Sequence, residues 1–89
     1  MANKRSLKRT ISLLCEALFS ECVAASLYGA ENQAESANTL LEAIIKMQTD
    51  FTNRVSHPEP GMKPKVYFRI LREQLAQHAG ELADQISNL

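Results

Sequence analysis

The chain has 89 residues, of which 45% are apolar and 22% charged, and its formal net charge is zero. This length suffices for one domain with one modest core and excludes a second domain, while the apolar content excludes an intrinsically disordered chain. Trp is absent and aromatic residues are few, so the apolar residues are mostly Leu, Ile and Ala, which favours helices over strands.

The first 30 residues have the outline of a signal peptide, because a basic start precedes an apolar run. Glu16 and Glu21 interrupt that run, and one charge at the centre of a membrane-spanning helix costs roughly 2.5 to 3.5 kcal/mol. We therefore expect no membrane association and a cytoplasmic protein. Cys15 and Cys22 fit this setting, since seven helical residues hold them about 10 Å apart, too far for a disulfide or for one metal ion.

The first helix is expected over about residues 4–28, with Gly29 as a left-handed stop. Apolar residues recur in it at steps of three and four, which predicts one stripe that faces the core. The stripe consists of Leu7, Ile11, Leu14, Leu18, Cys22 and Ala25, with Cys15 and Phe19 beside it.

A second apolar strip lies on the outer side of this helix. Its members are Leu13, Ala17, Val23, Ala24, Leu27 and Tyr28. A helix that is apolar nearly all round is usually buried, and a monomeric three-helix bundle cannot bury every side of one member. We therefore expect a homodimer that forms through the first helix. The alternative is that the long loop or a chain end covers this side.

The second helix is expected over about residues 33–55, with Asn32 as its N-cap and Glu35 three residues on. Its inward residues are Ala37, Leu41, Ile44, Phe51 and Val55, and Leu40, Ile45 and Met47 widen the same face. The helix must end before Pro58, because the residue before a proline is pushed out of helical geometry.

The third helix is expected over about residues 64–88, since Pro64 suits the first helical position. Its core stripe consists of Phe68, Leu71, Leu75, Ala79, Leu82, Ile86 and Leu89. Tyr67 lies at the edge of that stripe and is expected to pack there. With two short connections, the three segments predict an all-α protein, an up-down-up three-helix bundle that associates as a dimer.

The charges are distributed very unevenly. All ten Lys and Arg residues lie in residues 1–9 and 46–72, which hold only two acidic residues, whereas the other segments hold eight acidic residues and no basic one. An up-down-up bundle brings the start of the first helix, the end of the second and the start of the third together. We call this the basic end. Its candidate residues for binding an anion or a partner are Arg5, Arg9, Arg54, Lys63, Lys65 and Arg69.

Three interpretations of the basic end stay open. Its side chains are simply solvated and screened within about 8 Å at physiological salt, or an antiparallel dimer pairs opposite ends, or an external anion binds. For an anion, Pro64 opens the third helix without a Ser, Thr or Asp cap and leaves backbone N–H groups free. Val66 and Ile70, apolar among cations, suit an acidic protein partner better than bare phosphate. Sequence-specific DNA binding is not expected, since the third helix is too long for a recognition helix.

No motif for catalysis, a cofactor or a metal is present. His57 and His78 are expected to have structural or surface roles, and Glu16 and Glu21 point in different directions, unlike a metal-binding pair. No Gly-rich phosphate loop, CxxC or HExxH occurs. We therefore expect a protein–protein interaction module rather than an enzyme, with anion binding as the alternative function.

Two segments resemble known sequences: "ECVAASLY" (residues 21–28) and "RVSHPEPGM" (residues 54–62) are similar to segments of a group of small, uncharacterised helical bacterial proteins. The resemblance covers these motifs and extends over much of the chain. It implies an intracellular bacterial setting, and it carries no activity and no binding residue to this chain.

Overall fold

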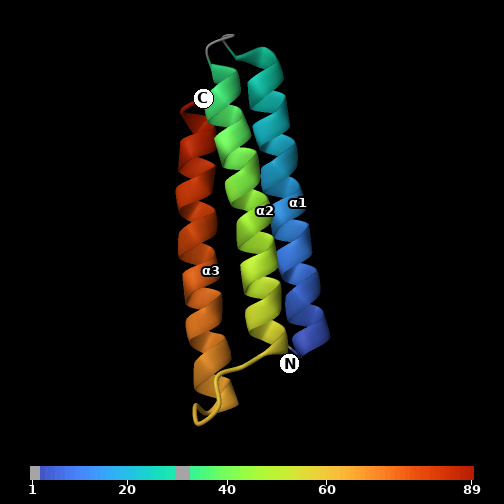
Figure 1. The fold of residues 1–89 in the computed structure, drawn as a ribbon, viewed down its shortest axis with the longest axis vertical. Coiled ribbons are helices and arrows are strands. Elements are labelled where there is room, and N and C mark those ends of the chain that lie inside the picture. Colours follow the sequence, from blue (N-terminus) through green and yellow to red (C-terminus); the bar gives the residue numbers. More distant parts are fainter. Residues whose placement is uncertain (1–2, 30–32) are drawn as a thin grey trace.

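A computed structural model of the chain describes residues 3–29 and 33–89. These residues form three α-helices and no strand: α1 (Lys4–Tyr28), α2 (Ala34–Ser56) and α3 (Pro64–Ser87). The all-α prediction is confirmed, and the expected helix ranges differ from these bounds by no more than one residue at any end. The helices run up, down and up beside one another in an elongated bundle of 48 × 19 × 16 Å (Figure 1).

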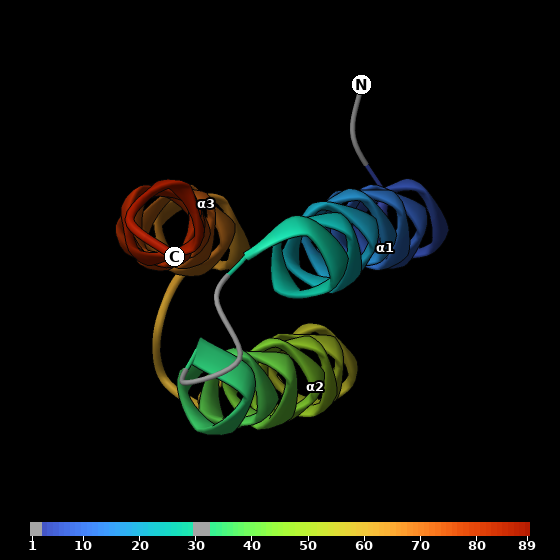
Figure 2. The ribbon, with the colours of Figure 1, turned by 90° about the horizontal axis from the view of Figure 1, so that it is seen from above.

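One hydrophobic core lies between the three helices, which occupy the corners of a triangle when viewed along the bundle (Figure 2). Its largest fully buried side chains are Phe51, Ile11, Ile44, Leu71 and Val55. Within the described residues, no polar or charged side chain is buried. Burial of this apolar surface is therefore the main force that holds the helices together.

The predicted core stripes are largely confirmed, with shifts that follow from the triangular arrangement. Cys15 is fully buried, while Leu14 is only partly buried. Phe19 and Ile45 were expected at the core, but they are 37% and 54% exposed, and this expectation is wrong. In a three-helix bundle each helix packs against two neighbours. Side chains at the edge of a predicted core stripe therefore lie in the groove between two helices, where they stay partly exposed to water.

The ends of α1 are defined by two different interactions. Asn3 caps the helix, because its side-chain oxygen accepts a hydrogen bond from the Ser6 N–H at 2.7 Å. The predicted left-handed stop at Gly29 is wrong, since its backbone is extended with φ −88° and ψ 177°. A glycine is needed there for another reason: a Cβ would lie 2.8 Å from the Ala25 carbonyl oxygen. The predicted cap of α2, Asn32, lies outside the described residues.

The connection between α2 and α3 is a turn that contains Gly61 at φ +88°, the one residue with positive φ in the described part of the chain. Lys63 then precedes the helix in an extended conformation, and Pro64 occupies the first position of α3, as predicted. No side chain caps this helix start. The turn places Lys63 at the same end of the bundle as the start of α1 (Figure 1).

Candidate functional site

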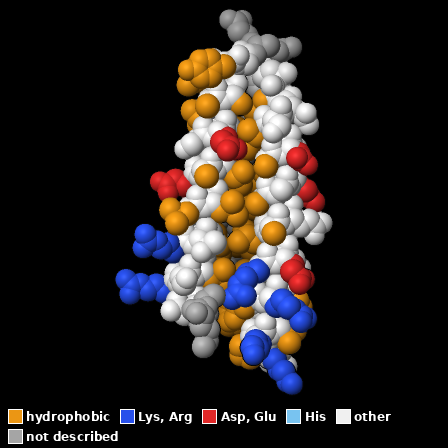
Figure 3. All heavy atoms as spheres, turned by 180° about the vertical axis from the view of Figure 1, so that it is seen from behind, with side chains coloured by type: hydrophobic (Ala, Val, Ile, Leu, Met, Phe, Trp, Pro, Cys, Tyr) orange, Lys and Arg blue, Asp and Glu red, His pale blue; other side chains and the backbone are white. Residues whose placement is uncertain are grey.

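The basic end is formed as the sequence predicted, because the start of α1, the end of α2 and the start of α3 lie at one end of the bundle (Figure 1). On the face drawn in Figure 3, the Lys and Arg side chains occupy the lower half, while most Asp and Glu side chains lie above them. The bundle therefore has a strong charge polarity along its long axis.

Most cations of the basic end point into solvent. The exposed members are Arg5, Arg9, Lys63, Lys65 and Arg69. Within residues 3–29 and 33–89, one ion pair occurs, and it involves none of these five side chains. Crowded cations repel one another at this end, and the N-terminal dipoles of α1 and α3 add positive partial charge there.

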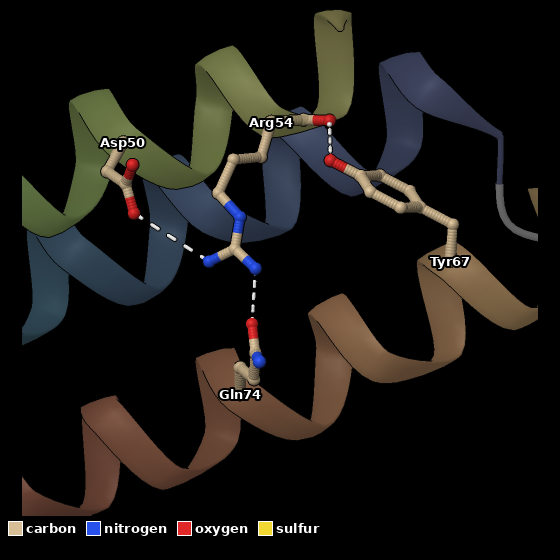
Figure 4. A network of polar contacts seen from close by, with 4 residues as sticks. All are labelled: Asp50, Arg54, Tyr67 and Gln74. Carbon is tan, nitrogen blue, oxygen red and sulfur yellow. Dashed lines mark hydrogen bonds and ion pairs between the residues drawn. The ribbon is translucent and has the colours of Figure 1, made fainter. Parts of the chain in front are cut away.

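Arg54 differs from the other predicted binding residues, because it is engaged within the bundle (Figure 4). Its guanidinium donates a hydrogen bond to the Gln74 side chain on α3 and lies 3.7 Å from the Asp50 carboxylate. It also lies 4.7 Å above the Phe51 ring, a cation–π geometry. Arg54 therefore joins α2 to α3 and has less capacity for an external ligand than the exposed cations.

Tyr67 completes this junction. Its hydroxyl donates a hydrogen bond of 2.9 Å to the Arg54 carbonyl oxygen, one of the last carbonyls of α2, which has no partner inside the helix (Figure 4). Its ring also packs edge-on against Phe68, at 5.3 Å between centroids. Tyr67 is half-buried against the core, as expected from the sequence.

A cleft between α1 and α3 adds two cations to those predicted from the sequence. Lys4 and Arg72 line a cavity of about 180 Å³ together with Asn3, and its apolar lining is Leu7 and Phe68. Both cations belong to the basic segments, but only the packing of α1 beside α3 brings them to one cleft. Cationic and apolar groups in one small cavity suit an anionic group attached to an apolar body.

This cleft continues along the bundle into a longer groove. A second cavity of about 360 Å³ shares Leu7 and Arg72 with the first and is lined further along by Leu14 and Leu75. Figure 3 shows the groove as a column of apolar side chains between two helices. The face of the bundle opposite α2 therefore has an open apolar seam.

The second candidate surface is the outer face of α1, defined by the six residues of its predicted dimer strip. Its large side chains are strongly exposed: Leu13 is 55%, Leu27 74% and Tyr28 90% exposed, and Val23 is 37% exposed. Ala17 and Ala24 are also exposed. The described loop at residues 57–63 lies at the opposite end of the bundle from Tyr28 and does not cover this face (Figure 1).

The exposed apolar surface extends beyond the predicted residues toward α2. A groove of about 310 Å³ between α1 and α2 is lined by Phe19 and Ile45, among other side chains. Sequence periodicity assigned both residues to the core, so it missed that they widen the exposed surface. Neighbouring apolar side chains in water are a recognised feature of protein interaction surfaces.

By length and composition alone, α1 is also apolar enough to cross a membrane or to act as a signal sequence. Its inner face nevertheless supplies five buried residues to the core, which a soluble core helix would do. Glu16 and Glu21 are exposed near the middle of the helix and would be costly in a bilayer. The cytoplasmic setting therefore stays a prediction.

The groups with chemical reactivity are few. Burial raises the pKa of the Cys15 and Cys22 thiols, and the Cys22 thiol donates a hydrogen bond of 3.6 Å to the Ala37 carbonyl. His78 packs edge-on against Phe51 at 5.7 Å between ring centroids. In the described ranges, no group of three or more His, Cys, Asp or Glu side chains is arranged to hold a metal ion.

Comparisons with models of protein families, with curated proteins and with solved structures find no match to this chain. The resemblance to small helical bacterial proteins stays a prediction. Any function must therefore be inferred from the two surfaces themselves.

Proposed function

We propose that this chain is a small, non-enzymatic protein–protein interaction module, an up-down-up three-helix bundle that forms a homodimer through the outer face of α1 in the bacterial cytoplasm. The observation that supports the proposal best is the exposure of Leu13, Leu27 and Tyr28 on one helix whose opposite face already forms the core. A monomer would leave this surface in water, whereas a dimer removes it from water on both copies.

The free energy gained by burying these side chains is large enough to support a dimer. Complete burial of a Leu or Val side chain contributes about 1.5 to 3 kcal/mol, and each residue of a two-fold interface is buried twice. Association itself costs on the order of 4 to 15 kcal/mol, so a few such side chains are needed to offset it. Leu27 and Tyr28 supply most of this burial, Leu13 and Val23 contribute only in proportion to their exposed fractions of 55% and 37%, and Ala17 and Ala24 let the partner helix approach closely.

Ala24→Glu tests this proposal, because Ala24 is exposed in the bundle and central on the proposed interface. The variant should keep its helical circular dichroism, yet weaken the dimer by at least about 100-fold, since two unpaired charges would be buried per dimer. Sedimentation velocity at tens of micromolar measures the outcome. Gln77→Glu, which adds the same charge at an exposed position of α3, is the matched control and should leave the dimer intact. A monomeric wild-type chain would contradict self-association.

The alternative function is binding of an anionic ligand, a nucleic-acid backbone or an acidic protein segment at the basic end. It is favoured by the cleft that holds Lys4 and Arg72 and by the uncapped start of α3. Joint replacement of Lys63, Lys65 and Arg69 by Ala should abolish such binding without unfolding the bundle, because all three side chains are exposed.

Salt concentration separates the two functions. A complex with phosphate or nucleic acid should weaken steeply as salt rises, since bound counterions are released. A dimer that rests on the apolar side chains of α1 should respond little to sodium chloride. Titration of a single-stranded oligonucleotide at low and high salt, followed by fluorescence anisotropy, measures the salt dependence of such a complex. Unchanged binding by the triple variant would exclude Lys63, Lys65 and Arg69 as its site.

A further inference from the structure

We propose that the apolar seam between α1 and α3 binds one fatty acid, whose carboxylate lies at Lys4 and Arg72 and whose hydrocarbon chain follows the seam away from the basic end. This inference rests on the alternative function, anion binding at the basic end, and names the class of ligand and the residues that hold it. It does not depend on the homodimer, since none of the six residues of the outer face of α1 lines either cavity of the seam.

The charged end of the seam is the smaller cavity, of about 180 Å³, where Lys4 and Arg72 lie beside Asn3. Both cations are exposed, and within residues 3–29 and 33–89 neither forms an ion pair. The start of α1 adds the positive partial charge of its helix dipole at the same place. Among the described residues, no Asp or Glu lines either cavity. An anionic group here therefore meets two cations and no carboxylate that would repel it.

The apolar part of the seam begins directly beside these cations. Leu7 lines both cavities, and Leu14 and Leu75 line the larger one, of about 360 Å³. Thr10 also lines it, but its hydroxyl already donates a hydrogen bond of 3.1 Å to the Ser6 carbonyl within α1. Figure 3 shows the column of apolar side chains with Lys and Arg side chains at its lower end. The seam therefore matches a molecule with one anionic group on one apolar tail.

The dimensions of the seam fit a single hydrocarbon chain. Its lining on α1 runs from Lys4 to Leu14, which is about 15 Å at the helical rise of about 1.5 Å per residue. An extended saturated chain advances about 1.25 Å per carbon, so a chain of about twelve carbons has this length. A second helix is about 10 to 12 Å wide with its side chains and would not enter a cavity of about 180 Å³. The cavity volume therefore favours a narrow chain over a protein segment.

Titration of the isotope-labelled full chain with laurate, a fatty acid of this length, tests the inference by NMR below the concentration at which laurate forms micelles. The amide signals of residues 4–14 and 68–76 should shift most, since these segments line both cavities. Octanoate has the same head group and a shorter tail, and it should bind at least about 10-fold more weakly, because fewer methylene groups are buried. Dodecyltrimethylammonium has the same tail and a positive head group, and it should also bind at least about 10-fold more weakly.

The charged end of the seam is tested by the Lys4→Gln/Arg72→Gln double variant. It should keep its helical circular dichroism, because both side chains are exposed, and should bind laurate about 5- to 10-fold more weakly than the wild-type chain. Lys63→Gln/Lys65→Gln is the matched control, since it removes two exposed cations from the same end of the bundle that line neither cavity. An equal loss in both double variants would show that laurate responds only to the overall charge of this end, which would overturn the inference.

The apolar part is tested by Ala76→Leu, because Ala76 is exposed and lines the larger cavity. The longer side chain should occupy the path of the hydrocarbon chain and weaken laurate binding at least about 10-fold. Ala34→Leu makes the same change at an exposed position at the start of α2 and should leave binding unchanged.

Three results would overturn this inference: no binding of laurate, binding that neither seam variant weakens, or amide shifts confined to the outer face of α1. If laurate fails to bind while the oligonucleotide binds at the basic end, anion binding stands, and an acidic protein segment becomes the occupant to test at the seam. Sedimentation velocity tests the homodimer separately, so its failure is distinguishable from the failure of this inference.

Discussion

The two faces of α1 have similar composition and very different surroundings. The inner face buries Leu7, Ile11, Cys15, Leu18 and Cys22 among the other helices, while the outer face leaves Leu13, Leu27 and Tyr28 in water. Apolar periodicity alone does not distinguish the two, because both recur at helical spacing. α1 therefore carries more apolar surface than the core of its own bundle buries, and the exposed remainder indicates a binding partner.

Truncation of one residue on each face of α1 should give the largest difference in the free energy of unfolding. Ile11 is fully buried, so Ile11→Ala should lower the free energy of unfolding by about 2 to 5 kcal/mol. Leu27 is 74% exposed, so Leu27→Ala should change the stability of the monomer by no more than about 0.5 kcal/mol, while it weakens the proposed dimer. Urea unfolding at low protein concentration measures both, and equal losses would remove the distinction between the faces.

The cations of the basic end also differ in their surroundings, because Arg54 is engaged within the bundle and the others are exposed. Arg54→Ala removes the contacts with Gln74, Asp50 and Phe51 and should lower the free energy of unfolding by about 1 to 2 kcal/mol. Lys63→Ala, at an exposed position, should have an effect within about 0.5 kcal/mol. A neutral Arg54→Ala in urea unfolding would show that the α2–α3 junction does not depend on this side chain.

Two tyrosines offer a matched pair for a smaller effect. Tyr67→Phe removes the hydroxyl that donates to the Arg54 carbonyl, and the loss should be about 1 kcal/mol of unfolding free energy. Tyr28→Phe removes a hydroxyl from a side chain that is 90% exposed and should be neutral in the monomer. Thermal unfolding followed by circular dichroism compares them, and equal melting temperatures would contradict the capping role of Tyr67.

The smallest expected effect concerns the two buried thiols. Burial raises the pKa of Cys15 and Cys22, so the folded chain retains protons that the unfolded chain releases at alkaline pH. Their contribution to stability is therefore fully present below the ordinary thiol pKa of about 8.5 and declines as pH rises above it. Urea unfolding from pH 7 to 9.5 should show this decline. The Cys15→Ala/Cys22→Ala double variant should show a shallower one; an equal slope would assign the decline to other groups.

Helix positions were accessible from sequence because their signals are local. Pro64 starts α3 and Pro58 follows the end of α2 because proline restricts its own backbone and that of its neighbour. Gly29 shows the limit of such signals: it does end α1, but a close approach to the Ala25 carbonyl requires the glycine, rather than a left-handed backbone. The presence of a glycine thus identified the end of the helix correctly, but it did not identify the physical reason why a glycine is required there.

The candidate site was accessible only in part. The segregation of charge along the chain, with an up-down-up order of helices, is sufficient to predict the basic end. The sequence did not indicate that Arg54 is engaged by Gln74, or that Lys4 and Arg72 share a cleft. These relations join residues far apart in the chain, and no local pattern encodes which side chains meet across two helices.

By itself, the sequence determined three helices, their direction in an up-down-up bundle, most of the core and the uneven placement of charge, because periodicity, turn residues and short connections act locally. Only the tertiary structure decided which apolar residues remain in water. Phe19 and Ile45 met the same periodic criterion as buried residues, yet they lie at the open groove between α1 and α2. Burial depends on the neighbours that a side chain meets in space, and for the outer face of α1 residues 3–29 and 33–89 supply few.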